Sequence, residues 1–186
     1  LLGEMECYYL LNKFDSTIIT SNKILALEKA DENVSEKASY YLAKSLLKNG
    51  NSGQAIEEFK KLTNAKNTEY ASEAQYTLAE IQYNNIQLDE AEKIILEITS
   101  NPSSEFWLAK AFILWADIFK ERGNKIQAKQ TLQSIIDNYE GDQSIIDEAQ
   151  NKLNEINNKQ SQEQKLQEQK LQEQKEAVDE IIIENK

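Results

Sequence analysis

Alanine recurs at a nearly constant spacing through the middle of this sequence, and this recurrence limits the fold more than any other feature. Ala55, Ala91 and Ala128 are separated by 36 and 37 residues. A period of this size, within about 20 to 50 residues, is typical of arrays in which one helical hairpin stacks on the next. Small side chains at fixed places let neighbouring helices approach closely, while larger apolar residues fill the gaps. The sequence therefore predicts a solenoid of repeated hairpins.

The residues around these alanines follow the same period. Ala43, Ala79 and Ala116 each end a stretch in which a large residue precedes a small one, so the first helix of a hairpin can lie close to the second. One Pro and five Gly in 186 residues favour helices, and strand-like alternation is not visible. Apolar stretches end at four candidate helix caps: Gly50, Asn84–Asn85, Gly123 and Gly141.

These positions resemble the tetratricopeptide repeat family. The resemblance covers residues 36–140 and implies an all-α, right-handed superhelical solenoid of antiparallel helical hairpins. Two departures stand in the second copy, where Ile86 replaces the turn glycine and Gln82 replaces an aromatic residue. The stretches 76–80 and 106–110 are also similar to repeats of bacterial cell-envelope scaffold proteins.

The two ends of the chain differ from its repeated middle. Apolar residues at three- and four-residue spacing from Ile145 to Ile156 predict a helix that caps the last hairpin. The tail repeats Lys-Leu-Gln-Glu-Gln, a period of five that does not fit a coiled-coil heptad. It is either a tether or a low-complexity tail without a specific role. Ile181–Ile183 either pack against another surface or remain in solvent. We expect a degenerate hairpin over 1–32, three hairpins over 33–143 (about 33–66, 67–101 and 103–140), a capping helix over 144–158 and a polar tail, helical or disordered, over 159–186.

The resemblance also implies a concave groove, lined by the first helix of each hairpin, that holds an extended peptide or a helix. Tyrosines bordered by charges of both signs suit such a surface, because the ring stacks and the hydroxyl forms hydrogen bonds. The alternative is a solvated face with the tyrosines packed between helices. The groove positions carried over from the family are Lys37, Tyr40, Lys44, Lys48, Glu73, Tyr76, Glu80, Tyr83, Asn84, Lys110, Asp117, Lys120 and Glu121.

A specialised form of this groove is disfavoured. Family members that bind the terminal carboxylate of a peptide use a Lys and an Asn one turn apart, and here Tyr40 and Lys44 occupy those places. The two tryptophans have separate expectations. Trp115 occupies a core place of the repeat, whereas Trp107 is expected with Phe106 at an exposed aromatic edge.

The composition argues against an enzyme. The chain has no His and one Cys, which excludes His-based acid–base chemistry, zinc sites and an intrachain disulfide. We expect Cys7 to be a buried apolar side chain. The carboxylates of Asp89, Glu90 and Glu92 are the enzymatic alternative, as acid–base groups or cation ligands, but acids at a helix start are explained by the helix dipole. The sequence predicts no catalytic residue, cofactor or metal.

Charge and hydropathy limit the partners. A net charge of -11 disfavours nucleic acid, and the apolar runs are too short to span a membrane. The chain opens on Leu1 without a visible signal, so we interpret it as a fragment of a longer protein from the bacterial cytoplasm or periplasm. The predicted function is a protein-interaction scaffold that binds a peptide or helix, with homo-assembly through the solenoid ends as the alternative.

Overall fold

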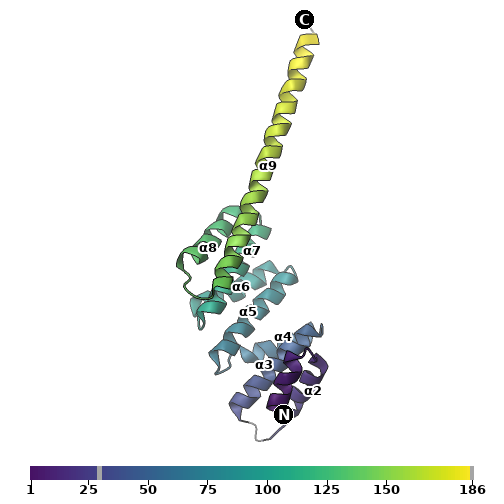
Figure 1. Ribbon diagram of the computed structural model, residues 1–186, viewed down its shortest axis with the longest axis vertical. Helices are drawn as coiled ribbons and strands as arrows, with labels where there is room; N and C mark the ends of the chain where they lie inside the picture. The colour runs from purple at the N-terminus through teal and green to yellow at the C-terminus, as the bar shows by residue number, and fades with distance from the viewer. Residues whose placement is uncertain (29–30, 185–186) are drawn as a thin grey trace.

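The computed structural model describes residues 1–28 and 31–184, with side chains as far as Gln172. Within these residues every regular element is an α-helix. The helices stack in chain order into an elongated array, and the last one projects beyond it (Figure 1). They are α1 (Leu2–Leu10), α2 (Phe14–Leu25), α3 (Glu32–Lys48), α4 (Ser52–Leu62), α5 (Thr68–Asn84), α6 (Leu88–Ser100), α7 (Glu105–Glu121), α8 (Lys125–Asn138) and α9 (Gln143–Glu184).

Consecutive helices pair as hairpins, and the hairpins pack on one another. α1 packs against α2, α3 against α4, α5 against α6, and α7 against α8. The second helix of each hairpin then contacts the next helix along the chain, as α4 does with α5 and α6 with α7. This arrangement is the all-α helical solenoid that the sequence predicts. The expected hairpins at about 33–66, 67–101 and 103–140 contain α3–α4, α5–α6 and α7–α8.

The core is continuous along the array because each apolar cluster joins a hairpin to the first helix of the next one. Three clusters connect α3–α4–α5, α5–α6–α7 and α7–α8–α9, and a smaller one connects α1, α2 and α3. The recurrent alanines lie inside these clusters, where a methyl group allows close helix approach. Six of them expose 1% or less of their surface: Ala43, Ala55, Ala79, Ala91, Ala116 and Ala128.

The four hairpin turns share one backbone geometry. The residue that leaves the helix is left-handed, with φ of 56° at Asn12, 79° at Gly50, 62° at Ile86 and 77° at Gly123. Its amide and the next one bond to carbonyl groups in the last helical turn at 2.8–3.1 Å. α5 ends at Asn84 with Asn85 as its cap, as predicted, but the left-handed conformation expected of this pair is wrong. Asn85 has φ of -85°, and Ile86, 36 residues after Gly50, takes the left-handed position.

Gly141 has a different role from the predicted helix cap. α8 ends through Tyr139, which has φ of -86° and ψ of 121°, and Gly141 does not have a positive φ. The Tyr139 hydroxyl turns back and accepts a hydrogen bond from the Asp142 amide at 3.2 Å. A Cβ atom at Gly141 would overlap the Tyr139 ring. Glycine here therefore accommodates the end of a ring and does not serve a left-handed backbone; a larger residue would displace that ring.

The segments expected as a capping helix and a polar tail form one helix, α9. Its first part packs in the last core cluster with α7 and α8. Lys125 of α8 pairs with Glu163 at 2.5 Å, so the two helices remain in contact to that point. Leu166 and Leu171 farther along are each 53% exposed, on the part of α9 that projects from the array (Figure 1). The side chains of Ile181–Ile183 lie outside the described part of the chain.

Candidate partner-binding face

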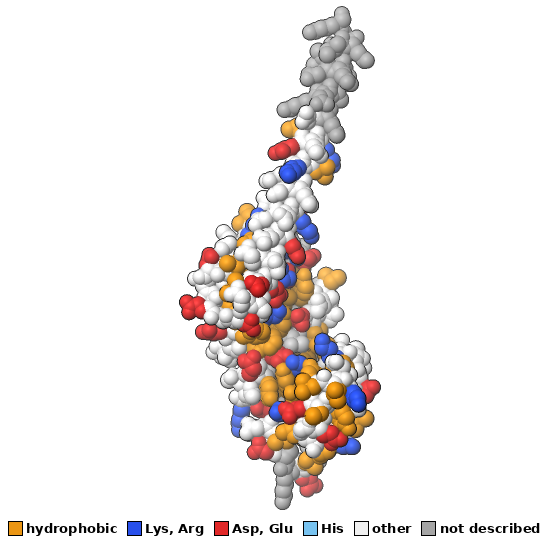
Figure 2. Space-filling model, viewed as in Figure 1, with side chains coloured by type: hydrophobic (Ala, Val, Ile, Leu, Met, Phe, Trp, Pro, Cys, Tyr) orange, Lys and Arg blue, Asp and Glu red, His pale blue; other side chains and the backbone are white. Residues whose placement is uncertain are grey.

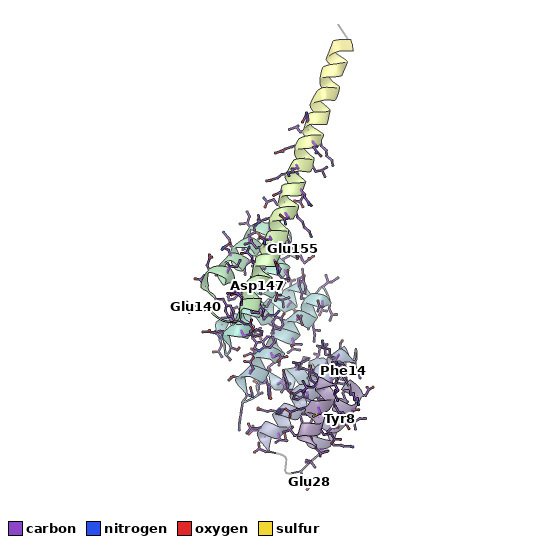
Figure 3. All side chains as sticks on the ribbon, in the orientation of Figure 1. Tyr8, Phe14, Glu28, Glu140, Asp147 and Glu155 are labelled. Atoms are coloured by element: carbon purple, nitrogen blue, oxygen red, sulfur yellow. The ribbon has the colours of Figure 1, made fainter. Side chains whose placement is uncertain are left out.

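The predicted groove residues all lie on α3, α5 and α7, the first helices of three hairpins. Their spacing of three, four and seven residues places those of one helix on a common side. First helices are neighbours in the array, since α1 contacts α3, α5 contacts α7, and α7 contacts α9. We call the surface formed by these residues, together with the side chains of α1 and α9 that contact them, the A-helix face. Figure 3 shows the side chains along the array.

A three-residue polar cluster joins α3 to α5. The Tyr40 hydroxyl donates a hydrogen bond to Glu73 Oε2 at 2.5 Å, and the Lys44 ammonium donates to Glu73 Oε1 at 2.7 Å and to the Tyr40 hydroxyl at 2.8 Å. Burial raises the pKa of Tyr40, and its bond to Glu73 raises it further. Burial alone would lower the pKa of Lys44, but its bonds to Glu73 and Tyr40 outweigh this and raise it. Both groups therefore hold their protons at neutral pH and bind the carboxylate.

Tyrosine rings from α1, α3 and α5 contact one another beside this cluster. Tyr9 and Tyr41 meet edge to face with ring centres 5.0 Å apart, and Tyr40 stacks on Tyr70 at 4.3 Å. The Lys44 ammonium lies 4.7 Å from the centre of the Tyr40 ring, within the range of a cation–π interaction. These contacts hold the rings in place, so this part of the A-helix face is rigid.

The contact between α5 and α7 centres on Tyr76. This side chain is only 7% exposed, and its hydroxyl donates a hydrogen bond to Glu80 at 2.9 Å. Its ring lies 5.2 Å from the Trp107 ring, and the Lys110 ammonium lies 5.7 Å from its centre. Burial raises the pKa of Tyr76, and the charge of Glu80 raises it further. Tyr76 is a structural residue of the array more than a surface for a partner.

Trp107 is not the exposed edge that the sequence predicts. It is half-buried between α5 and α7, and its indole N–H donates to Glu69 Oε1 at 2.5 Å. Phe106 lies perpendicular to it at 5.0 Å and is also half-buried, against the last core cluster. The two rings therefore cover the core between hairpins.

Ion pairs join α7 to α9. The Lys110 ammonium pairs with Glu148 at 2.9 Å, and Asp117 pairs with Lys152 at 2.7 Å. Asp117 also pairs with Lys120 of its own helix at 3.3 Å. The Asp117 carboxylate is only 13% exposed, so these cations neutralise a partly desolvated charge.

A different set of predicted residues remains open to solvent. Lys48, Asn84 and Glu121 are the last residues of α3, α5 and α7, and all three are exposed. In the part of the chain that the structure describes, no hydrogen bond or ion pair of their side chains is present. Tyr83 is half-buried beside them; burial raises its pKa, and the charges of Asp117 and Glu121 raise it further. We call Lys48, Tyr83, Asn84 and Glu121 the turn-side row.

Comparison with known families agrees with this geometry. A family model described as tetratricopeptide repeat matches residues 37–65 and 106–141, which contain most of α3–α4 and α7–α8. These two stretches are tetratricopeptide repeats. The resemblance that the sequence analysis drew from its small-residue positions is confirmed. A comparison with curated proteins finds none that matches. Repeats of this family generally mediate protein–protein interactions, so binding a protein partner is the expected general role.

Sequence reasoning missed the part of the A-helix face that α1 and α9 supply. Glu6 of α1 forms an ion pair with Lys37, and Glu148 and Lys152 of α9 pair with residues of α7. The signal was present in the period, because Glu148 and Lys152 stand 38 and 35 residues after their partners. Family positions were carried over only to complete repeats, which left out the first and last helices.

Two of the three carboxylates considered as an enzymatic alternative bind the only arginine of the chain. Arg122 contacts Glu92 and Asp89 at 2.5 Å each, and the half-buried Trp115 donates its indole N–H to Glu92 at 2.8 Å. Burial would raise the pKa of Glu92, but the hydrogen bonds from Arg122 and Trp115 outweigh it and hold the pKa below its ordinary value. Glu90 is exposed and does not belong to this cluster. These contacts join α6, the second helix of one hairpin, to the end of α7, the first helix of the next.

Other candidate sites add nothing to this picture. In residues 1–28 and 31–172, His, Cys, Asp and Glu do not gather in groups of three that could hold a metal ion. None of the helices described is both long and apolar enough to cross a bilayer. Cys7 is exposed, contrary to the prediction, because it lies on the side of α1 opposite the buried Met5.

Proposed function

We propose that this chain is a non-catalytic scaffold and that a peptide or helix of a partner protein binds along its A-helix face. The turn-side row carries the proposal. Lys48, Asn84 and Glu121 follow one another at 36 and 37 residues, the period of the repeat, and each ends the first helix of its hairpin. A partner that follows the array therefore meets one of them on every repeat.

The chemistry of the row suits a polypeptide. It offers a cation at Lys48, an amide at Asn84 and a carboxylate at Glu121, with the Tyr83 ring close enough to Glu121 to feel its charge. The charges in the middle of the A-helix face already neutralise one another, as Lys44 and Glu73 do. Binding along the row leaves these pairs intact, so no buried charge loses its partner. We expect the bound segment to carry an acidic group near α3 and a basic group near α7.

Site-specific photocrosslinking tests this proposal. A photoreactive phenylalanine analogue is placed in the whole protein at Asn84 in the row, and as a control at Ile126 on α8, which is 72% exposed. We expect a partner to be crosslinked from Asn84 and not from Ile126. A charge reversal, Lys48→Glu, should weaken capture of that partner. Crosslinks of equal yield from Ile126 would refute binding along the A-helix face.

Homo-assembly through the solenoid ends is the second candidate, and the N-terminal end favours it. Large apolar side chains there are more than half exposed. Figure 2 shows hydrophobic side chains at the surface around the N-terminal end of the array. Light scattering over a range of concentrations would distinguish this candidate, because Leu10→Glu should then shift dimers to monomers without affecting the Asn84 crosslink. The exposed side chains are Leu1, Leu10, Leu11, Ile19 and Leu27.

A further inference from the structure

A pocket of about 330 Å3 lies in the third repeat, between the start of α7 and the end of α8. Leu108 and Phe112 from α7 and Ile135 from α8 form its apolar part, and Ser134 and Asn138 from α8 also line it. Two exposed carboxylates, Glu105 and Glu140, stand at its rim. Within the described residues neither carboxylate has a hydrogen bond or an ion pair. We call this cavity the α7–α8 pocket; Glu140 is labelled at the edge of the array in Figure 3.

The hairpin α3–α4, the first of the three repeats, shows which residues lie at the equivalent place, which we call the corner of the repeat. Glu32 is the first residue of α3, as Glu105 is of α7, and two repeat spacings of 36 and 37 residues separate them. The Lys66 ammonium forms an ion pair with Glu32. Glu36 accepts hydrogen bonds from the amides of Lys66 at 2.6 Å and Asn67 at 3.2 Å. A cation from the following loop therefore closes this corner of the first repeat.

The third repeat keeps the carboxylate but lacks the cation. Tyr139 stands where the period would place the counterpart of Lys66, and Ala109 stands in the place of Glu36. The Tyr139 hydroxyl bonds to the Asp142 amide at 3.2 Å, which turns the ring toward its own loop. Glu140 adds a second carboxylate at the place that Asn67 occupies in the first repeat. The α7–α8 pocket is thus the same corner with its positive charge missing.

We propose that the α7–α8 pocket receives the alkyl stem and charged head of a lysine or arginine side chain from a partner protein. The carboxylates of Glu105 and Glu140 pair with the head, and the walls of Leu108, Phe112 and Ile135 contact the stem. The pocket is open to solvent on one side. A small free amine would stay largely exposed there, whereas a side chain fixed to a folded partner loses less freedom on binding.

This surface is separate from the A-helix face. Leu108 and Phe112 lie roughly 160° around α7 from Lys110, at about 100° per residue, so they point away from the predicted groove. Failure of this proposal would leave the turn-side row untouched, and the Asn84 crosslink would not report on it. A partner could engage either surface alone.

A titration followed by amide NMR of the whole protein tests the proposal. The probe is an acetylated, amidated Leu-Lys-Leu peptide, and the matched probe replaces Lys with uncharged norleucine. We expect saturable shifts at the amides of Asn138 and Gly141 with the lysine peptide only. The double variant Glu105→Gln, Glu140→Gln should weaken binding roughly five- to tenfold, from two partly exposed ion pairs. Glu155→Gln on α9, exposed and labelled in Figure 3, is the control and should bind as the parent does.

Three outcomes would overturn the proposal. Equal binding of the norleucine peptide would show that no cation is recognised. Unchanged affinity in the double variant, with an unchanged helical spectrum, would exclude the two carboxylates. A third titration with pentylamine separates the source of the cation, because binding as tight as that of the peptide would assign the pocket to free amines instead of a protein side chain.

Discussion

The turn between α5 and α6 contains a strained residue, and replacing it should stabilise the protein. Ile86 has φ of 62° in a turn where the first and third repeats have glycine at 79° and 77°. A β-branched side chain is strongly disfavoured in the left-handed region because its Cβ approaches the backbone carbonyl. Ile86 is also 83% exposed, so it contributes little packing in return. The substitution Ile86→Gly therefore removes strain at a small loss of buried surface.

The magnitude follows from three opposing effects. A left-handed non-glycine residue costs about 2 kcal/mol, taking the upper value for a branched side chain. Removing a side chain that is 83% exposed loses roughly 0.4 kcal/mol of apolar burial. The added freedom of glycine in the unfolded chain costs about 0.5 kcal/mol more. We expect Ile86→Gly to raise the free energy of unfolding by about 1 kcal/mol, and Tm by about 2–4 °C.

The assay is urea and thermal unfolding followed by circular dichroism, with Ile19→Gly as the matched control. Ile19 is 56% exposed in the middle of α2, so the same chemical change should lower stability there by about 0.5–1 kcal/mol through helix propensity. Opposite signs for the two variants are the expected result. A loss of stability in Ile86→Gly would refute the reasoning, because it would mean that the turn is not strained by its side chain.

Three further substitutions test other parts of the fold. Gly141→Ala should lose about 1 kcal/mol in thermal unfolding, because its Cβ displaces the end of the Tyr139 ring from the Asp142 amide, and an unchanged Tm would contradict the close approach. The pKa of Glu92 is held below 4.5, so its pairing with Arg122 stabilises the fold at neutral pH, and this stabilisation is lost as the pH falls through the lowered pKa. Glu92→Gln should therefore reduce the loss of stability below about pH 4.5, as measured by urea unfolding across that range. Tyr40→Phe should cost about 1 kcal/mol in urea unfolding, because its carboxylate partner on α5 loses one hydrogen bond, and an unaltered midpoint would show that water replaces it.

The fold could be predicted because its determinants are local and repeated. A buried alanine such as Ala55 or Ala91 is specified by its own size and by its period, and both are visible in the sequence. The turn after α5 was harder to predict, because the adjacent candidates Asn84–Asn85 and Ile86 compete for the left-handed position. Asn84–Asn85 satisfies the chemistry of a helix cap, yet the stacking of complete repeats fixes the turn at Ile86, so tertiary register overrides local preference.

The state of the groove residues could not be read from the sequence, because it depends on which side chain faces which across two hairpins. Lys44 and Glu73 are both groove positions in the family, and only the structure shows that they bind each other at 2.7 Å. The general pattern was nevertheless available. Lys110 and Glu148, for example, stand 38 residues apart, close to one period, so adjacent first helices place them at similar heights.

This pairing has a consequence for how the face binds a partner. A peptide lying across the centre of the A-helix face would have to separate partly desolvated pairs such as Asp117 with Lys152 and leave one charge uncompensated. A peptide along the turn-side row meets Lys48, Asn84 and Glu121 while they are solvated and lack partners in the described chain, so only their hydration is exchanged. The intramolecular ion pairs join successive repeats, and under the proposed function they would also direct a partner toward the turns. Exposed charges of this kind are screened by salt, so binding along the row should weaken steadily with ionic strength, while the partly buried pairs are screened less.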